Sequence, residues 1–227
     1  MRNAHIPPAD QAARDAGHTP PRRGRPRSEQ ADRAILAAAA DLLAERGLSG
    51  MSIEEVASRA GVGKATIYRR WASRGTLALD AFLAEFQSQQ PLPDTGSLHD
   101  DLLAALRNWI RSVTRTSAGP VLAGLIAEAQ LDPGLATAWR ERVVEHLRAQ
   151  HKVMLDRAVA RGEISAKTDY DVVLDLMFGA AYHRLLHGHR PLTDQFARSV
   201  VDMIMAGLRE TGGGNAAVTQ RAVRRTP

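Results

Sequence analysis

Residues 52–71 read SIEEVASRAGVGKATIYRRW and predict two short helices joined by a turn. Ser52 and Glu55 have the spacing of a capping box, in which a hydroxyl and a carboxylate satisfy free amides at a helix start. Gly61 suits the left-handed backbone conformation that ends a helix. The apolar residues between these ends recur at helical spacing and predict one buried face: Ile53, Val56, Ala57 and Ala60.

The second helix of the pair is expected to begin near Lys64, with Ile67 and Trp71 facing inward. The side chains left outside are small, hydroxylic or basic: Lys64, Ala65, Thr66, Tyr68, Arg69 and Arg70. A short helix that presents such side chains from its first turns fits a helix-turn-helix module, whose second helix enters the major groove of DNA. We therefore expect residues 52–71 to bind double-stranded DNA.

The flanking residues complete a DNA-binding domain over residues 28–74. Periodic apolar positions predict a preceding helix over about 31–46, and Ser73 is placed to cap a following helix. This fourth helix, at 73–90, would link the DNA-binding domain to the rest of the chain. Proline and glycine place a domain boundary near 87–97.

An arginine cluster, Arg22-Arg23-Gly24-Arg25-Pro26-Arg27, precedes this domain. Because Gly24 and Pro26 resist helix formation, residues 1–27 are expected to be a disordered basic arm. An arm of this kind can insert arginines into the minor groove, with Arg25 and Arg27 as candidates; nonspecific attraction to phosphates is the alternative.

Charge is distributed unevenly along the chain. The formal net charge is +5, yet residues 22–74 carry eleven Lys or Arg against six Asp or Glu, while residues 75–210 carry fourteen against seventeen. The basic segment 22–74 followed by the acidic segment 75–210 indicates a polyanionic partner that binds the N-terminal part of the chain. The absence of cysteine excludes disulfides and thiolate chemistry, and no apolar run reaches membrane-spanning length, so a soluble cytoplasmic protein is expected.

The remaining chain predicts helices without a credible strand, so the expected fold is all-α with about nine helices. Residues 97–210 would form a helical regulatory and dimerisation domain, and residues 211–227 a disordered tail. Helices at about 170–187 and 193–209 carry apolar residues around more than one face, which must be covered from more than one side. A symmetric homodimer through these two helices is expected; two central helices of one large core are the alternative.

The stretch from Ala34 to Phe82, and above all Gly61 to Trp71 followed by Ser73 and Arg74, resembles the DNA-binding domain of the tetracycline-repressor (TetR) family. The resemblance implies a palindromic operator bound by a dimer, an all-helical body, and release by a small molecule that binds the body. It also implies roles for individual residues. Lys64, Ala65, Thr66 and Arg69 would face base edges or phosphates, and Ser52, Tyr68 and Arg74 would contact phosphates.

Two glycines depart from the family pattern. Gly63 stands where serine is more usual, and Gly75 where a larger residue is common. We expect both helix starts to be looser as a result.

Bulky or polar residues on the helices of the body are candidates for a ligand pocket: Trp109, Leu122, Glu128, Trp139, Met177, Phe178 and His183. Ordinary core packing, and for Glu128 and His183 a satisfied polar group at an interface, are the alternatives. His183, His187 and His189 have a spacing that metals use, but surface or interface histidines are the better interpretation, and no metal or cofactor is expected.

A transcriptional repressor is the leading functional prediction. The alternative is an architectural DNA-binding protein that acts without an inducer and shows little sequence preference. An enzyme is not expected, because the sequence contains no phosphate-binding loop, catalytic carboxylate pair or nucleophile elbow.

Overall fold

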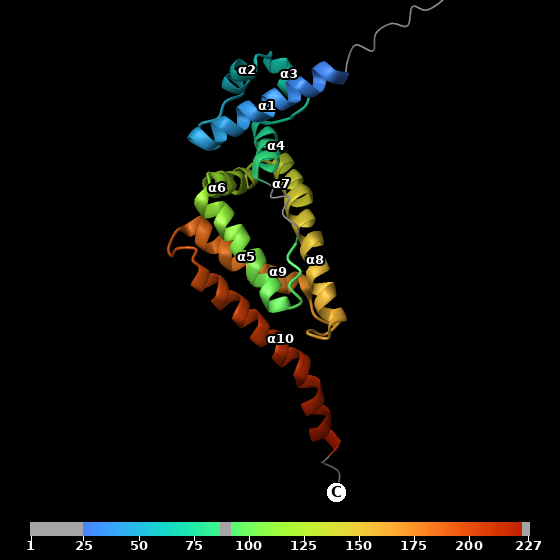
Figure 1. Ribbon diagram of the computed structural model, residues 1–227. Helices are drawn as coiled ribbons and strands as arrows, with labels where there is room; N and C mark the ends of the chain where they lie inside the picture. Colours follow the sequence, from blue (N-terminus) through green and yellow to red (C-terminus); the bar gives the residue numbers. More distant parts are fainter. Residues whose placement is uncertain (1–24, 87–91, 224–227) are drawn as a thin grey trace, which may run out of the picture.

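The computed structural model describes residues 25–86 and 92–223, which are helical and contain no strand (Figure 1). Three of the segments, α7, η1 and α8, follow one another without a break, so the described residues form nine continuous helical stretches. The helices are α1 (Arg25–Arg46), α2 (Ile53–Ala60), α3 (Lys64–Tyr68), α4 (Arg74–Phe86), α5 (Leu98–Arg115), α6 (Ala118–Ala129), α7 (Pro133–Trp139), the π-helical turn η1 (Arg140–Val144), α8 (Glu145–Ala160), α9 (Tyr170–His187) and α10 (Asp194–Val223). The all-α prediction is confirmed.

Local chemistry sets the bounds of the helix-turn-helix pair. At the start of α2, the Ser52 hydroxyl accepts a hydrogen bond of 3.2 Å from the Glu55 amide. Gly61 ends the helix with φ of 65°, in the left-handed region. Ile53, Val56 and Ala57 are buried, as their spacing predicts. The Glu55 carboxylate bonds Arg46 and Arg59 and thereby ties α2 to the end of α1.

Two predicted boundaries are wrong. Helix α1 begins at Arg25, so residues 25–27 do not belong to an extended arm. Pro26 is compatible with this start, because the first turn of a helix has no partner for its amides. Helix α10 continues to Val223, through the glycines at 212–214, where a disordered tail was expected. Glycine weakens a helix without forbidding it, and the alanines that follow are strong helix formers. Residues 1–24 and 224–227 lie outside the described part of the chain.

Helix α4 runs from the α1–α3 group into the body of the molecule (Figure 1). Its buried residues Leu77 and Leu79 share one hydrophobic core with α1, α2 and α3. The same core contains Val121 and Leu125 of α6 and Leu135 of α7. A second core joins α5, α8, α9 and α10. The first core includes residues of both the DNA-binding end and the body. Because its side chains are closely packed, a shift of α6 or α7 should also displace α4.

Within the described ranges, no helix combines the length and apolarity that crossing a bilayer requires.

Candidate functional site

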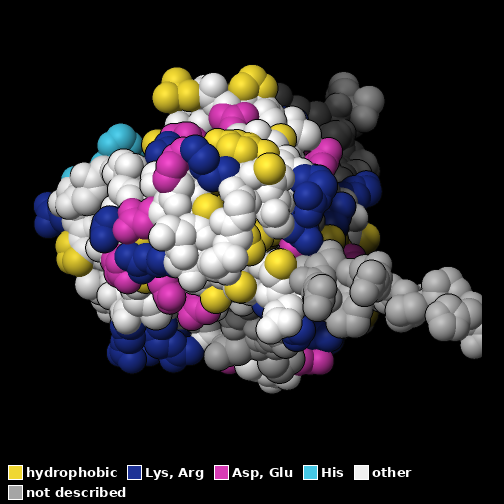
Figure 2. All heavy atoms as spheres, turned by 90° about the horizontal axis from the view of Figure 1, so that it is seen from above, with side chains coloured by type: hydrophobic (Ala, Val, Ile, Leu, Met, Phe, Trp, Pro, Cys, Tyr) yellow, Lys and Arg dark blue, Asp and Glu magenta, His cyan; other side chains and the backbone are white. Residues whose placement is uncertain are grey.

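The short helix α3 is anchored by its apolar side and presents its polar side to solvent. Ile67 is fully buried, and Trp71, just after the helix, is 8% exposed and donates its indole N–H to Asp80 of α4 at 2.9 Å. The outward side chains are Lys64, Ala65, Tyr68 and Arg69, with Thr66 partly exposed and Ser52 exposed at the start of α2. Figure 2 looks onto this end of the molecule, where basic side chains alternate with acidic ones.

Lys64 forms an exposed ion pair with Glu54, at 2.9 Å between Nζ and Oε1. This hydrogen bond raises the pKa of Lys64, so the ammonium stays charged. An exposed pair contributes little free energy, which leaves Lys64 able to exchange Glu54 for a phosphate or a base edge. Gly63 is the N-cap residue of α3 and has no side chain that could cap the helix.

Two of the predicted DNA contacts are turned away from the exposed face. Arg70 forms an ion pair with Asp32 of α1 and donates to the Thr66 carbonyl at 3.3 Å, and its side chain is 19% exposed. Arg74 pairs with Glu128 of α6 at 3.0 Å. Both arginines thus hold the DNA-binding end together or join it to the body. For Arg25 and Arg27 the backbone lies in α1, and their side-chain contacts are not described.

Polar contacts fasten the start of α4 to the corner between α6 and α7. The Ser73 hydroxyl caps α4, accepting the Thr76 amide at 3.2 Å, and donates to Asp132 at 2.9 Å. Asp132 also caps α7 by accepting the amides of Gly134 and Leu135. The bond from the Leu135 amide, and then that from Ser73, lower the pKa of Asp132. Together with the Arg74–Glu128 pair, this contact gives the body two polar links to residues close to α3.

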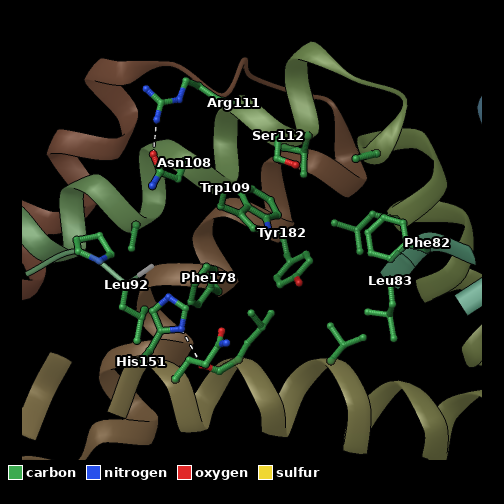
Figure 3. A pocket seen from close by; sticks show the side chains of 18 of the residues that line it. Phe82, Leu83, Leu92, Asn108, Trp109, Arg111, Ser112, His151, Phe178 and Tyr182 are labelled. Atoms are coloured by element: carbon green, nitrogen blue, oxygen red, sulfur yellow. Dashed lines mark hydrogen bonds between the residues drawn. The ribbon is translucent and has the colours of Figure 1, made fainter. Parts of the chain in front are cut away.

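A cavity of about 470 Å³ lies in the body, between α4, α5, α6, α8 and α9 (Figure 3). Phe82 and Leu83 of α4 form part of its wall. The opposite walls are aromatic, with Trp109 of α5 edge-on to Phe178 and Tyr182 of α9 at ring separations of 6.4 and 5.3 Å. A concave apolar space of this size suits a small organic molecule.

Three of the seven pocket candidates line this cavity: Trp109, Leu122 and Phe178. The other four are elsewhere. Met177 is fully buried in the second core, and Trp139 packs against the first. Glu128 is bound to Arg74, and the exposed His183 contacts the rings of His187 and His189.

The prediction also missed His151 of α8 and Tyr182 of α9, which supply polar groups to the cavity wall. His151 is 7% exposed, and its Nδ1 lies 2.7 Å from the Leu147 carbonyl. Burial lowers the pKa of His151, so the ring is neutral, Nδ1–H donates to Leu147, and Nε2 is an acceptor. Burial also raises the pKa of Tyr182 to about 12, which keeps its hydroxyl protonated.

Helical spacing contained a signal for both residues. His151 lies four positions after Leu147, and Tyr182 four positions after Phe178, and in each pair both residues line the cavity.

His183, His187 and His189 lie close together at the end of α9. The ring of His183 lies 4.7 Å from that of His187 and 4.9 Å from that of His189. In the part of the chain that the structure describes, no group of three or more His, Asp or Glu side chains is arranged to hold a metal ion.

Two family models match the chain. Residues 35–81 match the model of bacterial regulatory proteins of the tetR family, and residues 92–204 match the model of the tetracyclin repressor-like C-terminal domain. The first match covers α2, α3 and most of α1 and α4, and the second covers the helical body.

Individual proteins are similar over most of their length. The HTH-type transcriptional regulator YdeS of Bacillus subtilis (strain 168) is 36% identical over 190 residues, which cover 84% of this chain and 96% of YdeS. The DNA-binding transcriptional repressor TetR of Mycobacteroides abscessus is 32% identical over 189 residues, covering 82% and 97% of the two chains. The crystal structure of the TetR family transcription regulator SCO0332 is 37% identical, with a TM-score of 0.69, and the match covers 78% of this chain and 98% of SCO0332.

Proposed function

The chain belongs to the TetR family of DNA-binding transcription regulators, and on this premise we propose that it is a repressor that binds a palindromic operator as a homodimer and leaves it when a small molecule occupies the cavity of the body. The family is a class of regulators and not of enzymes, as the sequence predicts.

The outward side of α2 and α3 is the DNA-binding surface in this proposal. Lys64, Ala65, Thr66 and Arg69 face the major groove, while Tyr68 and Ser52 bind phosphates. Their exposure supports the assignment, because a reading side chain must reach the groove. Arg25 and Arg27, at the start of α1, are further candidates for phosphate or minor-groove contacts.

Dimerisation is proposed through α9 and α10. Val172 and Leu176 of α9 are 51% and 57% exposed, and Met203 of α10 is 75% exposed. The opposite sides of the same helices, including Met177 and Val201, are buried in the second core. Apolar side chains on the outside of two adjacent helices favour a second copy of the chain as their cover.

The observation that carries the proposed release is the position of α4. Phe82 and Leu83 line the cavity at one end of the helix, and Ser73 and Arg74 at the other end lie next to α3. A ligand that favours a different position of α4 therefore changes the placement of α3 in each half of the dimer. Since two recognition helices must match half-sites about 34 Å apart, a changed separation weakens operator binding.

The test is a selection of bound duplexes from a random library by the purified protein, followed by sedimentation of the complex. A palindromic consensus, with one dimer per duplex at saturation, is expected. A monomer that saturates the operator would overturn the dimer proposal.

Architectural binding without an inducer, the alternative from the sequence, predicts no consensus in this selection and a steep loss of affinity with salt. Family membership favours the repressor. The alternative also relied on an extended arm, of which residues 25–27 are helical and residues 22–24 lie outside the described residues.

A further inference from the structure

His151 is an unusual residue for the wall of an apolar cavity. It is one of two polar residues in the described chain that are buried below a tenth of their surface, the other being Asp101. Asp101 Oδ1 accepts hydrogen bonds from the amide and hydroxyl of Thr95, whereas Oδ2 lies 3.7 Å from Arg161 and has no hydrogen-bond partner among the described residues. His151 donates from Nδ1 to the Leu147 carbonyl, and no hydrogen bond to its Nε2 is found among the described residues. Nε2 is not one of the fully buried atoms that lack a partner, so water or a ligand in the cavity can reach it. An acceptor at a cavity wall that has no protein partner is available for a hydrogen bond from water or from a ligand.

The Tyr182 hydroxyl is another polar group in the wall of the cavity. The ring stands edge-on to Trp109, and Figure 3 shows the hydroxyl directed into the open part of the cavity. Because this hydroxyl stays protonated, it offers a hydrogen to an acceptor. His151 thus offers an acceptor and Tyr182 a donor beside the aromatic rings of the wall. Asn108, Ser112 and Gln150 are further uncharged polar residues of the lining.

The charge and shape of the cavity further restrict the chemical class of its ligand. The described residues that line the cavity include no carboxylate, so a bound cation would have no opposite charge among them. The two lining arginines, Arg111 and Arg115, are exposed, so water solvates their charges at the edge of the cavity. Four rings, those of His151, Phe178, Trp109 and Tyr182, follow one another edge to face along the wall at centroid distances of 5.1 to 6.4 Å. Walls of this kind favour flat aromatic partners.

From this arrangement we propose that the cavity binds an uncharged aromatic compound that donates a hydroxyl or ring N–H to His151 Nε2 and accepts the Tyr182 hydroxyl hydrogen through a carbonyl or similar group. The inference rests on the proposed function only in treating the cavity as the effector site. It adds the chemical class of the effector and two residues that select it.

Calorimetric titration of the full chain without DNA tests the class. The probes are 2-naphthol, which donates; 2-methoxynaphthalene, its matched partner without a donor; and 2-acetylnaphthalene, which only accepts. We expect 2-naphthol to bind at least about tenfold more tightly than its methyl ether, the effect of one satisfied buried acceptor. The cation 2-naphthylmethylammonium, the anion 2-naphthoate and the aliphatic decanoate should bind more weakly than 2-naphthol.

Two variants that keep a ring assign the contacts. His151→Phe should lower the affinity for 2-naphthol about tenfold and leave 2-acetylnaphthalene nearly unchanged, and Tyr182→Phe should do the reverse. The crossed pattern separates lost hydrogen bonds from a damaged cavity, which would weaken both probes equally. Three outcomes would each overturn the proposed class. They are equal losses of affinity for both probes, tighter binding of a charged or aliphatic probe, and no binding of any probe at about 1 mM. A Kd of about 1 mM corresponds to a binding free energy of only about −4 kcal/mol.

Operator release by the same probes is measured separately. Binding without release leaves the ligand class standing and contradicts the proposed function. Release by a charged compound that binds in the cavity leaves the function standing and contradicts the class.

Discussion

Gly75 of α4 lies directly against Leu135 of α7: a Cβ atom at position 75 would stand 2.8 Å from Leu135 Cδ2. Leu135 is fully buried in the core shared by the DNA-binding end and the body, so it has little room to move. The glycine that looked like a loose helix start is thus a close contact between the two parts. Its neighbours Ser73 and Arg74 supply the polar links at the same place.

Gly75→Ala is therefore expected to lower the free energy of unfolding by about 1–3 kcal/mol, the usual cost of overpacking a tight core. Leu135→Ala alone should cost about 2–5 kcal/mol by leaving a cavity. The double variant should be less destabilised than the sum of the two, because the smaller residue 135 makes space for the new methyl group. Urea unfolding of all four proteins measures this coupling, and strict additivity would contradict direct contact.

Arg69 and Arg70 are adjacent but are expected to respond oppositely to truncation. Arg70→Ala removes a partly buried ion pair with Asp32 and should cost about 1–2 kcal/mol of stability, between the values for exposed and buried pairs. Arg69→Ala should leave stability within about 0.5 kcal/mol and weaken operator binding by about 1–3 kcal/mol. Thermal unfolding and operator titration of both variants distinguish the structural role from the DNA-binding role. A stable Arg70→Ala protein with altered base preference would show that Arg70 contacts bases.

Asp80 joins the end of the recognition helix to the body. One carboxylate oxygen accepts the Trp71 indole N–H at 2.9 Å, and the other pairs with Arg142 of η1. Asp80→Ala should cost about 1–3 kcal/mol, because it leaves the buried indole N–H unsatisfied, and should weaken operator binding. Asp80→Asn is the matched control: it keeps an acceptor for Trp71, loses the charge facing the 44% exposed Arg142, and should cost less than about 1 kcal/mol. Equal losses from the two variants in denaturant unfolding would assign the effect to Arg142 instead.

Features that depend on interactions between residues close in sequence were easier to predict than features that depend on contacts between distant helices. The helix-turn-helix pair depends on local chemistry, such as the Ser52 cap and the left-handed Gly61, and was predicted correctly. The inward turn of Arg70 depends on Asp32 in another helix, which no local pattern reveals. Helical spacing separates inside from outside, but it does not separate a core position such as Met177 from a cavity position such as Tyr182. The cavity was therefore only partly predicted.

The proposed dimer predicts a selective effect of charge on α9. Leu176→Asp places a carboxylate in the proposed interface and should yield a monomer at micromolar concentration, since a desolvated charge without a partner is costly. Leu131→Asp is the matched control, because Leu131 is 85% exposed at the corner between α6 and α7. Sedimentation velocity distinguishes the two. If the Leu176→Asp protein remained a dimer, α9 would not form the interface.

His99 of α5 makes stability depend on pH. It bonds Asp100 at 2.9 Å and Asp202 of α10 at 3.0 Å, and these bonds, the first more than the second, raise its pKa above the ordinary value of 6.5. A raised pKa stabilises the fold fully below the ordinary value, and the contribution is lost as pH rises through the raised value. The melting temperature of the natural chain should therefore exceed that of His99→Gln by more at pH 6 than at pH 8. The side chain is 37% exposed, so we expect a difference of no more than ~2 °C. Asp202→Asn should reduce this pH dependence, and an advantage that grew toward pH 8 would contradict the assignment.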